Sequence, residues 1–202
     1  MIIFDVGANN GESCIHFCKD KNNTVYAFEP TPHLINQALQ PKANSFENFK
    51  IIPKAVGDEC KKVTFNIAGH HNWGCSSLYS FNENLSETWP GRDDFYFNDK
   101  IEVEMITMES FLKENLDILN IDFFHCDTQG NDVAVLEGFG SYITKIEKGQ
   151  IEVSGKNPLY AGSKNTLENA RKILEKHNFE IYELSNDDPA GNEINVRFRR
   201  KN

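Results

Sequence analysis

The sequence predicts an α/β fold built around a largely parallel sheet. Residues 1–6 and 24–29 are short apolar runs, and each carries an acidic residue at its end, where a turn begins. Strand-like and helix-like patterns then alternate along the chain, which is typical of a sheet with helices on its faces. Residues 179–184 and 193–198, by contrast, follow one another as strands without a helix between them. A plain dinucleotide-binding fold does not end in this way.

The other elements follow from local patterns. Thr31 and Pro32 suit the N-cap and the first position of a helix, and residues 165–168 have the spacing of a capping box. We expect helices over 11–20, from residue 31 onward, around 109–114, after Gly130 and behind the capping box. We expect further strands at 51–58, 62–67, 101–105, 121–126 and 150–154.

Composition limits the function classes. A chain of 202 residues predicts a single domain over 1–202, and its net charge of −9 disfavours a nucleic-acid partner. No apolar run approaches the roughly 20 residues that span a bilayer, and no basic signal segment precedes the first strand, so we expect a cytoplasmic protein without a membrane partner. The five cysteines, Cys14 and Cys18 among them, are expected to be free thiols, and no metal site is predicted.

Residues of about 68–99 show no regular period and are rich in aromatic side chains. A loop of this length is uncommon in a compact domain unless it serves as a lid or a binding loop. We therefore predict an aromatic-rich insertion or lid here. We expect most of its rings only to hold it against the domain and one or two to contact a substrate. The candidates are His70, His71, Trp73, Tyr79, Phe81 and Trp89.

The first thirty residues predict a nucleoside site. Asp5 and Glu29 end consecutive strands, and Gly7 and Gly11 lie in the turn that follows the first strand. Glu29 could accept hydrogen bonds from ribose hydroxyls, and Gly7 would allow a ligand to approach the backbone. The pattern D-x-G-x-x-x-G lacks the glycine spacing of a dinucleotide fingerprint. The acid before Gly7 favours a cationic ligand, S-adenosylmethionine, with NAD as the alternative.

Several motifs in order resemble the FkbM family of S-adenosylmethionine-dependent methyltransferases. The first segments are Asp5-Val6-Gly7-Ala8-Asn9-x-Gly11 and Ala27-Phe28-Glu29-Pro30. The later ones are Ala55-Val56-Gly57-Asp58, Ser76-Ser77-Leu78, Asp127-x-Gln129-Gly130 at the end of the fourth motif strand, and Ile151-Glu152-Val153-Ser154. The family usually has Lys at the position of His125 and often has Glu at that of Asp132.

The resemblance implies a Rossmann-like class I methyltransferase fold: a seven-stranded, mostly parallel sheet with an antiparallel terminal strand and helices on both faces. It implies S-adenosyl-L-methionine as the cofactor and methyl transfer to a hydroxyl of a sugar, a glycan or a small natural product. The cofactor-binding positions that it implies are Asp5, Gly7, Ala8, Asn9, Gly11, Glu29, Pro30, Ala55, Val56 and Asp127. The alternatives are a domain that binds the cofactor without catalysis and an NAD-dependent oxidoreductase.

Three residues are candidates for the catalytic base. Asp127 follows the strand 121–126, His125 shares its face of that strand, and Glu152 lies in an apolar strand where burial would raise its pKa. Each has an alternative role: Asp127 could hold the methionine end of the cofactor, His125 could be a core histidine, and Glu152 could be a paired structural acid.

Overall fold

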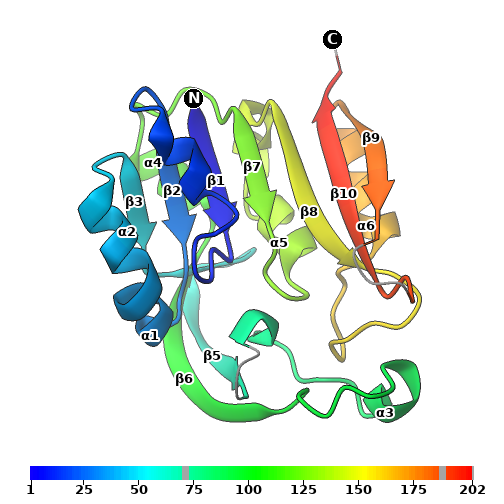
Figure 1. Ribbon diagram of the computed structural model, residues 1–202. Helices are drawn as coiled ribbons and strands as arrows, with labels where there is room; N and C mark the ends of the chain where they lie inside the picture. The colour runs from blue at the N-terminus through cyan, green and yellow to red at the C-terminus, as the bar shows by residue number, and fades with distance from the viewer. Residues whose placement is uncertain (70–72, 187–189, 202) are drawn as a thin grey trace.

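The computed structural model describes residues 1–69, 73–186 and 190–201. Within them, seven strands form one sheet in the order β3-β2-β1-β7-β8-β10-β9 (Figure 1). All neighbours pair in parallel except β10, which is antiparallel to both β8 and β9. The predicted sheet with its antiparallel terminal strand is therefore confirmed. The strands are β1 (Ile2–Val6), β2 (Thr24–Phe28), β3 (Phe49–Ile52), β7 (Phe123–Cys126), β8 (Lys148–Ser154), β9 (Phe179–Ser185) and β10 (Glu193–Arg200).

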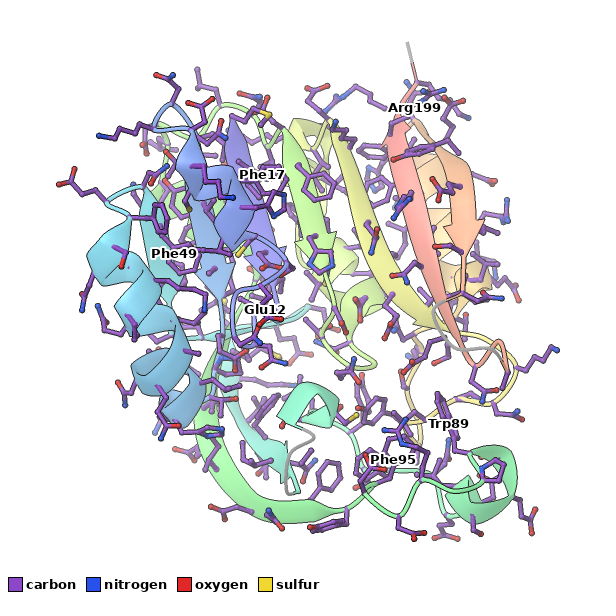
Figure 2. The ribbon with its side chains drawn as sticks, viewed as in Figure 1. Glu12, Phe17, Phe49, Trp89, Phe95 and Arg199 are labelled. Atoms are coloured by element: carbon purple, nitrogen blue, oxygen red, sulfur yellow. The ribbon has the colours of Figure 1, made fainter. Side chains whose placement is uncertain are left out.

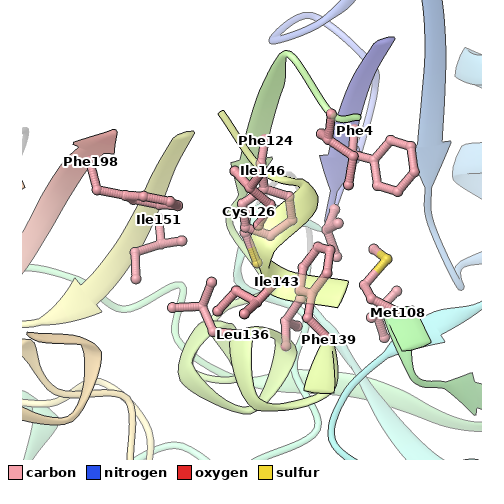
Figure 3. Close-up of a cluster of buried hydrophobic side chains, with 14 of the residues drawn as sticks. Phe4, Met108, Phe124, Cys126, Leu136, Phe139, Ile143, Ile146, Ile151 and Phe198 are labelled. Atoms are coloured by element: carbon pink, nitrogen blue, oxygen red, sulfur yellow. The ribbon is translucent and has the colours of Figure 1, made fainter. Parts of the chain in front are cut away.

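Helices cover one face of this sheet along its length and the other face only over β1 to β3. The larger core joins alternate strand residues to α4 (Met108–Glu114), α5 (Asp132–Glu137), the 3-10 helix η4 (Gly140–Lys145) and α6 (Leu167–Lys176). Figure 3 shows its centre, where the rings of Phe124 and Phe139 meet edge to face at 5.2 Å. The smaller core joins β1 to β3 with η1 (Ile15–Lys19), η2 (Ile35–Leu39) and α2 (Gln40–Ser45), the last two continuing α1 (Pro32–Leu34).

Two local predictions near helix starts need correction. The helix expected over 11–20 is only the five-residue 3-10 helix η1, because the chain first turns sharply: Asn9 and Gly11 both have positive φ, and the Gly11 amide bonds to the carbonyl of Ala8. At α6, Thr166 rather than Asn165 is the N-cap, and its hydroxyl accepts from the amide of Asn169. Cys14 and Cys18 are buried free thiols, as expected.

A second sheet of three strands lies across the carboxyl ends of the parallel strands (Figure 1). Its order is β4-β6-β5, formed by β4 (Ala55–Val56), β6 (Phe97–Ile106) and β5 (Lys61–Ala68). The prediction that 51–58 forms one strand is therefore wrong. Pro53 interrupts it, because proline has no amide hydrogen to donate to a ladder, and the Lys54 amide turns back to the carbonyl of Ile52.

Residues 73–96, here called the aromatic segment, lie between β5 and β6 in the sequence. They contain η3 (Trp73–Cys75) and α3 (Leu85–Thr88). The ring centroids of Trp89 and Phe95 lie 5.5 Å apart. Figure 2 labels both side chains. Phe81 stacks on Tyr160 at 5.5 Å, and the Ala161 amide bonds to the carbonyl of Ser80. These contacts hold the segment against the loop that follows β8. His70 and His71 lie outside the described residues.

None of the described helices is long and apolar enough to cross a membrane.

Candidate functional site

A cavity lies between the carboxyl ends of β1, β2 and β7 and the second sheet with the aromatic segment. One part of its wall is apolar and the other is polar, and both parts draw on segments far apart in the sequence. The apolar wall consists of Phe28, Leu34, Val56, Phe65 and Leu78, and the polar wall includes Asn9, Glu29, Thr31, Lys54, Ser76, Asp127, Thr128, Gln129 and Asn131.

The amides of the glycine loop after β1 form hydrogen bonds within the protein. The amides of Gly7 and Ala8 both donate to the carbonyl of Phe28 at 3.0 Å, and the Asn9 amide donates to a carboxylate oxygen of Glu29 at 2.9 Å. The Gly11 amide is likewise bonded, to the carbonyl of Ala8. A dinucleotide site needs such amides for its pyrophosphate. Because these four are occupied, the loop is unsuited to a dinucleotide.

Gly7 is required for a reason that the sequence did not suggest. An added Cβ would lie 1.9 Å from the carbonyl oxygen of Asp127, and Gly7 has a φ of +79°. The glycine therefore permits the ends of β1 and β7 to approach each other, and it also lines the cavity. A substitution such as Gly7→Val is expected to disturb the fold itself and is not a clean test of binding.

Glu29 is buried at the end of β2, with 4% of its surface exposed, and lines the cavity. Its two carboxylate oxygens accept from the amides of Asn9 and Thr31, both at 2.9 Å. Burial raises the pKa of Glu29, and the bonds from Thr31 and Asn9 partly oppose that shift. Each oxygen retains a lone pair for a further donor from the cavity.

Asp5 lies behind the cavity wall with none of its surface exposed. Its Oδ1 lies 2.7 Å from Nδ1 of His125 on β7, and the Ser13 hydroxyl donates to its Oδ2 at 2.6 Å. Burial alone would raise the pKa of Asp5, but the hydrogen bond and charge of His125 bring it below its usual value. Burial would likewise lower the pKa of His125, and Asp5 raises it above its usual value. Asp5 therefore favours the charged form of His125, and His125 does not line the cavity.

Asp127 follows β7 directly and lines the cavity. Its Oδ1 accepts from Nε2 of Gln129 at 2.6 Å. Burial raises the pKa of Asp127, although Gln129 and the positive charge of His125 act in the opposite direction. A carboxylate with a raised pKa beside a cavity has the properties that a general base requires.

Asp132, at the start of α5, is completely buried away from the cavity lining. Its Oδ2 accepts from the Thr128 hydroxyl at 3.0 Å and from Nδ2 of Asn165 at 3.3 Å. Burial and the charge of Asp127 raise the pKa of Asp132 to about 7. These contacts join the loop after β7 to the segment before α6, which is a structural role.

Glu152 on β8 is only half-buried and does not line the cavity. It lies on the sheet face that the described helices leave uncovered, since α5 and α6 are on the other side of β8 and β10 (Figure 1). On the same face, five polar residues pair in register across β1, β7, β8, β10 and β9: Asp5, His125, Gln150, Arg197 and Glu183. Glu152 approaches the cavity only through Nε2 of Gln129, at 3.4 Å.

The structure brings together six of the residues expected from the sequence at the cavity: Gly7, Asn9, Glu29, Pro30, Val56 and Asp127. Asp5, Ala8, Gly11, Ala55, His125 and Glu152 support the wall from behind or lie beside it instead. The sequence analysis did not single out Leu34, Lys54, Phe65, Gln129 and Asn131. Of these, only Gln129 belonged to a recognised motif. Leu34 and Asn131 lie at helix ends, and Lys54 and Phe65 lie next to or within strands of the second sheet. Among the described residues, no group of three or more His, Cys, Asp or Glu side chains could hold a metal ion.

The fold and this cavity define a class I methyltransferase that depends on S-adenosylmethionine. In the strand order the antiparallel β10 lies between β8 and β9, and the amides of Gly7, Ala8, Asn9 and Gly11 after β1 are already bonded within the protein. Both features argue against the NAD-dependent alternative.

A family model described as a methyltransferase FkbM domain matches residues 5–188. The chain therefore belongs to the FkbM family of methyltransferases. A search of curated proteins gives no match.

Solved structures of other proteins share the fold at low sequence identity. Magnesium protoporphyrin IX methyltransferase from Synechocystis PCC 6803, with bound S-adenosylmethionine, is 11% identical with a TM-score of 0.51, over 98% of this chain and 69% of that one. A fibrillarin pre-rRNA processing protein from Methanococcus jannaschii is 14% identical with a TM-score of 0.53, over 98% and 66% of the two chains. These likenesses support the fold alone.

Proposed function

We propose that this methyltransferase transfers the methyl group of S-adenosylmethionine to a hydroxyl oxygen of a sugar, a glycan or another small polar acceptor, with Asp127 as the base. The observation that carries the proposal is the contrast between Asp127 and His125. Asp127 lines the cavity with a raised pKa, whereas His125 does not line it and its Nδ1 is bonded to Asp5. An alcohol must lose a proton as it is methylated, and Asp127 is the candidate able to accept it.

The cavity wall fits the cofactor in two parts. The apolar side chains of Leu34, Val56, Phe65 and Leu78 suit a planar adenine, and the Glu29 carboxylate suits the two hydroxyls of a ribose. Among the polar residues of the lining, Asn9 suits the charged methionine group. When bound, the cofactor supplies a methyl group already activated by its sulfonium, so placement of the acceptor can account for much of the catalysis.

The uncovered face of β7, β8 and β10 supports a hydrophilic acceptor. It presents His125, Gln150, Glu152 and Arg197, and it adjoins the cavity beside Asp127. A flat surface of hydrogen-bonding groups favours a polyhydroxylated molecule over a hydrocarbon. The chain's net charge of −9 makes a nucleic-acid acceptor unfavourable.

Two measurements test the proposal. Isothermal titration with S-adenosylhomocysteine should give binding by the purified chain. Transfer of a labelled methyl group should then be measured across a panel of sugars, glycans, phenols and amines, and NMR of the product should show an O-methyl signal. Methylation of amines alone would contradict oxygen transfer.

A variant that fills the cavity provides the control for the site. Leu78 is partly exposed in the apolar wall, so Leu78→Trp should weaken binding of S-adenosylhomocysteine by about tenfold or more while the protein still folds. Leu116 is 71% exposed and far from the lining residues in sequence, and Leu116→Trp should leave binding unchanged. Equal binding by both variants would place the cofactor elsewhere.

A domain that binds the cofactor without catalysis remains the alternative, motivated by His125 in place of the family's usual Lys. The Asp5–His125 pair argues against it, because Asp5 raises the pKa of His125 and so favours the positive charge that a Lys would carry there. Binding of S-adenosylhomocysteine without methyl transfer to any member of the panel would support that alternative.

A further inference from the structure

We propose that Gln129 and Tyr160 form a positioning pair that couples the docking of the aromatic segment to the orientation of the Asp127 carboxylate. The importance of this coupling for catalysis rests on the proposed role of Asp127, but the coupling itself does not. Neither residue is proposed to contact the reacting atoms. Both act through Asp127.

The Gln129 side chain connects two carboxylates to a tyrosine. Its Nε2 donates to Asp127 at 2.6 Å and approaches Glu152 at 3.4 Å, whereas its Oε1 lies 2.8 Å from the Tyr160 hydroxyl. Because a carboxylate only accepts, Asp127 requires the Nε2 end of this amide, and the Oε1 end is then directed to the Tyr160 hydroxyl, which holds the side chain in place. The orientation of the Asp127 carboxylate therefore depends on Tyr160, which is 33 positions later in the sequence and is linked to Asp127 through the Gln129 side chain.

The backbone of Gln129 is held by the aromatic segment as well. Ser77 donates its hydroxyl to the Gln129 carbonyl at 2.6 Å, and Gln129 has a φ of +54°. A non-glycine residue in this left-handed conformation is maintained only when its surroundings impose it. Ser77 is one of the surrounding groups that do so, since it is completely buried and pairs with Asn66 through both backbone groups.

Tyr160 also contacts the aromatic segment directly. Its hydroxyl also lies 2.9 Å from the carbonyl oxygen of Cys75, so its single proton is shared between Cys75 and Gln129. Its ring stacks on Phe81, and Gly130 lies close beneath it, where an added Cβ would be 3.0 Å from the ring. Tyr160 thus contacts the aromatic segment and Gln129 at once.

The decisive experiment follows the Gln129 side-chain amide by NMR in the ligand-free protein, together with hydrogen exchange of the amides of Asn66 and Ser77. In Tyr160→Phe, which removes only the hydroxyl, the Gln129 Nε2 resonances should shift, and exchange at Asn66 and Ser77 should become about fivefold faster, as expected for one lost hydrogen bond. In Gln129→Met, which is of similar size, exchange at these two amides should increase to the same extent.

Tyr79→Phe is the matched control. Tyr79 also belongs to the aromatic segment, but its hydroxyl bonds to Asn131 at 3.3 Å rather than to Gln129. This variant should leave the Gln129 resonances in place. Unchanged Gln129 resonances in Tyr160→Phe, or the same shift in Tyr79→Phe, would overturn the pair.

Titration with S-adenosylhomocysteine separates this inference from the proposed function. Wild-type protein should bind it with slower exchange at Asn66 and Ser77, whereas Tyr160→Phe should bind it with a loss of most of that protection. If wild-type protein fails to bind, the proposed function fails, and the ligand-free measurements still decide whether Gln129 and Tyr160 are coupled. Full protection in ligand-bound Tyr160→Phe would contradict the coupling.

Discussion

Asp5 and Asp127 end neighbouring parallel strands, yet their surroundings give them opposite properties. Asp5 pairs with His125, whose hydrogen bond and charge bring the pKa of Asp5 below its usual value despite burial. Asp127 pairs with a neutral amide, Gln129, and burial raises its pKa. Asp5 has none of its surface exposed, whereas Asp127 faces the cavity. The charge of the hydrogen-bonding partner, more than the position on the strand, separates a structural acid from a candidate base.

Substitution of Asp127 should have the largest effect and should affect catalysis rather than folding. Asp127→Asn keeps the size of the side chain but cannot accept a proton, so the methyl-transfer rate should fall by about 10²- to 10⁴-fold, the usual contribution of a general base. The rate should be measured with an acceptor identified in the panel, and binding of S-adenosylhomocysteine should be measured beside it. A rate within threefold of wild type, roughly the scatter expected of a residue outside the chemistry, would mean that Asp127 is not the base.

Breaking the other pair should affect stability instead. His125→Ala leaves the Asp5 charge buried without its partner, and the loss should be about 3 kcal/mol or more in the free energy of unfolding. Urea unfolding measures this loss. The double variant Asp5→Asn/His125→Ala should recover much of this loss, because the buried charge of Asp5 is then removed together with its partner. Losses that simply add would show that the two side chains do not interact.

The Asp5–His125 pair also predicts how stability depends on pH. The folded-state pKa of His125 is raised above 6.5, so its stabilisation is complete below the pKa of unfolded histidine and is lost as the pH rises through the higher folded-state value. The loss should reach a slope of at most about 1.4 kcal/mol per pH unit. Urea unfolding between pH 6 and 9 measures it.

His125→Lys is the control for this pH dependence. Lysine has a reference pKa of about 10.4 and stays charged throughout the range, so the variant should hold its stability where wild type loses it. Burial of Asp127 and Asp132 also lowers stability as the pH rises, because the pKa of each is raised. Since both proteins share those carboxyls, their difference isolates His125. Parallel curves for the two proteins would contradict the assignment.

The sequence predicted the central sheet well, because each strand coincides with a local apolar run that ends in a turn. The predictions were wrong for elements whose bounds depend on contacts that a local pattern does not show. The strand at 51–58 divides at Pro53 because Ala55 and Val56 pair with β6, some fifty residues later. The helix at 11–20 shortened because Gly11 turns back on Ala8.

The candidate site was predicted in part for the same reason. Glu29 and Asp127 could be found, since both follow apolar runs and the ends of parallel strands share one edge. The pairing of Asp5 with His125 could not, because it depends on β1 lying beside β7 in one particular register. Gln129 was likewise recognised only as part of a motif, and its contacts could not be predicted. Its function depends on Tyr160, which lies in a loop without any regular pattern.

The smallest expected effect concerns the second partner of Asp5. Ser13 donates its hydroxyl to Asp5 Oδ2 at 2.6 Å, and Ser13→Ala removes this bond while the stronger bond to His125 remains. We expect a loss of about 1.5 kcal/mol in the free energy of unfolding, typical of a hydrogen bond to a charged group. Urea unfolding at pH 6, where His125 is charged, is the measurement. The same substitution in the Asp5→Asn background should cost less, because the acceptor is then neutral. An equal loss in both backgrounds would mean that Ser13 stabilises the turn after β1 rather than the Asp5 charge.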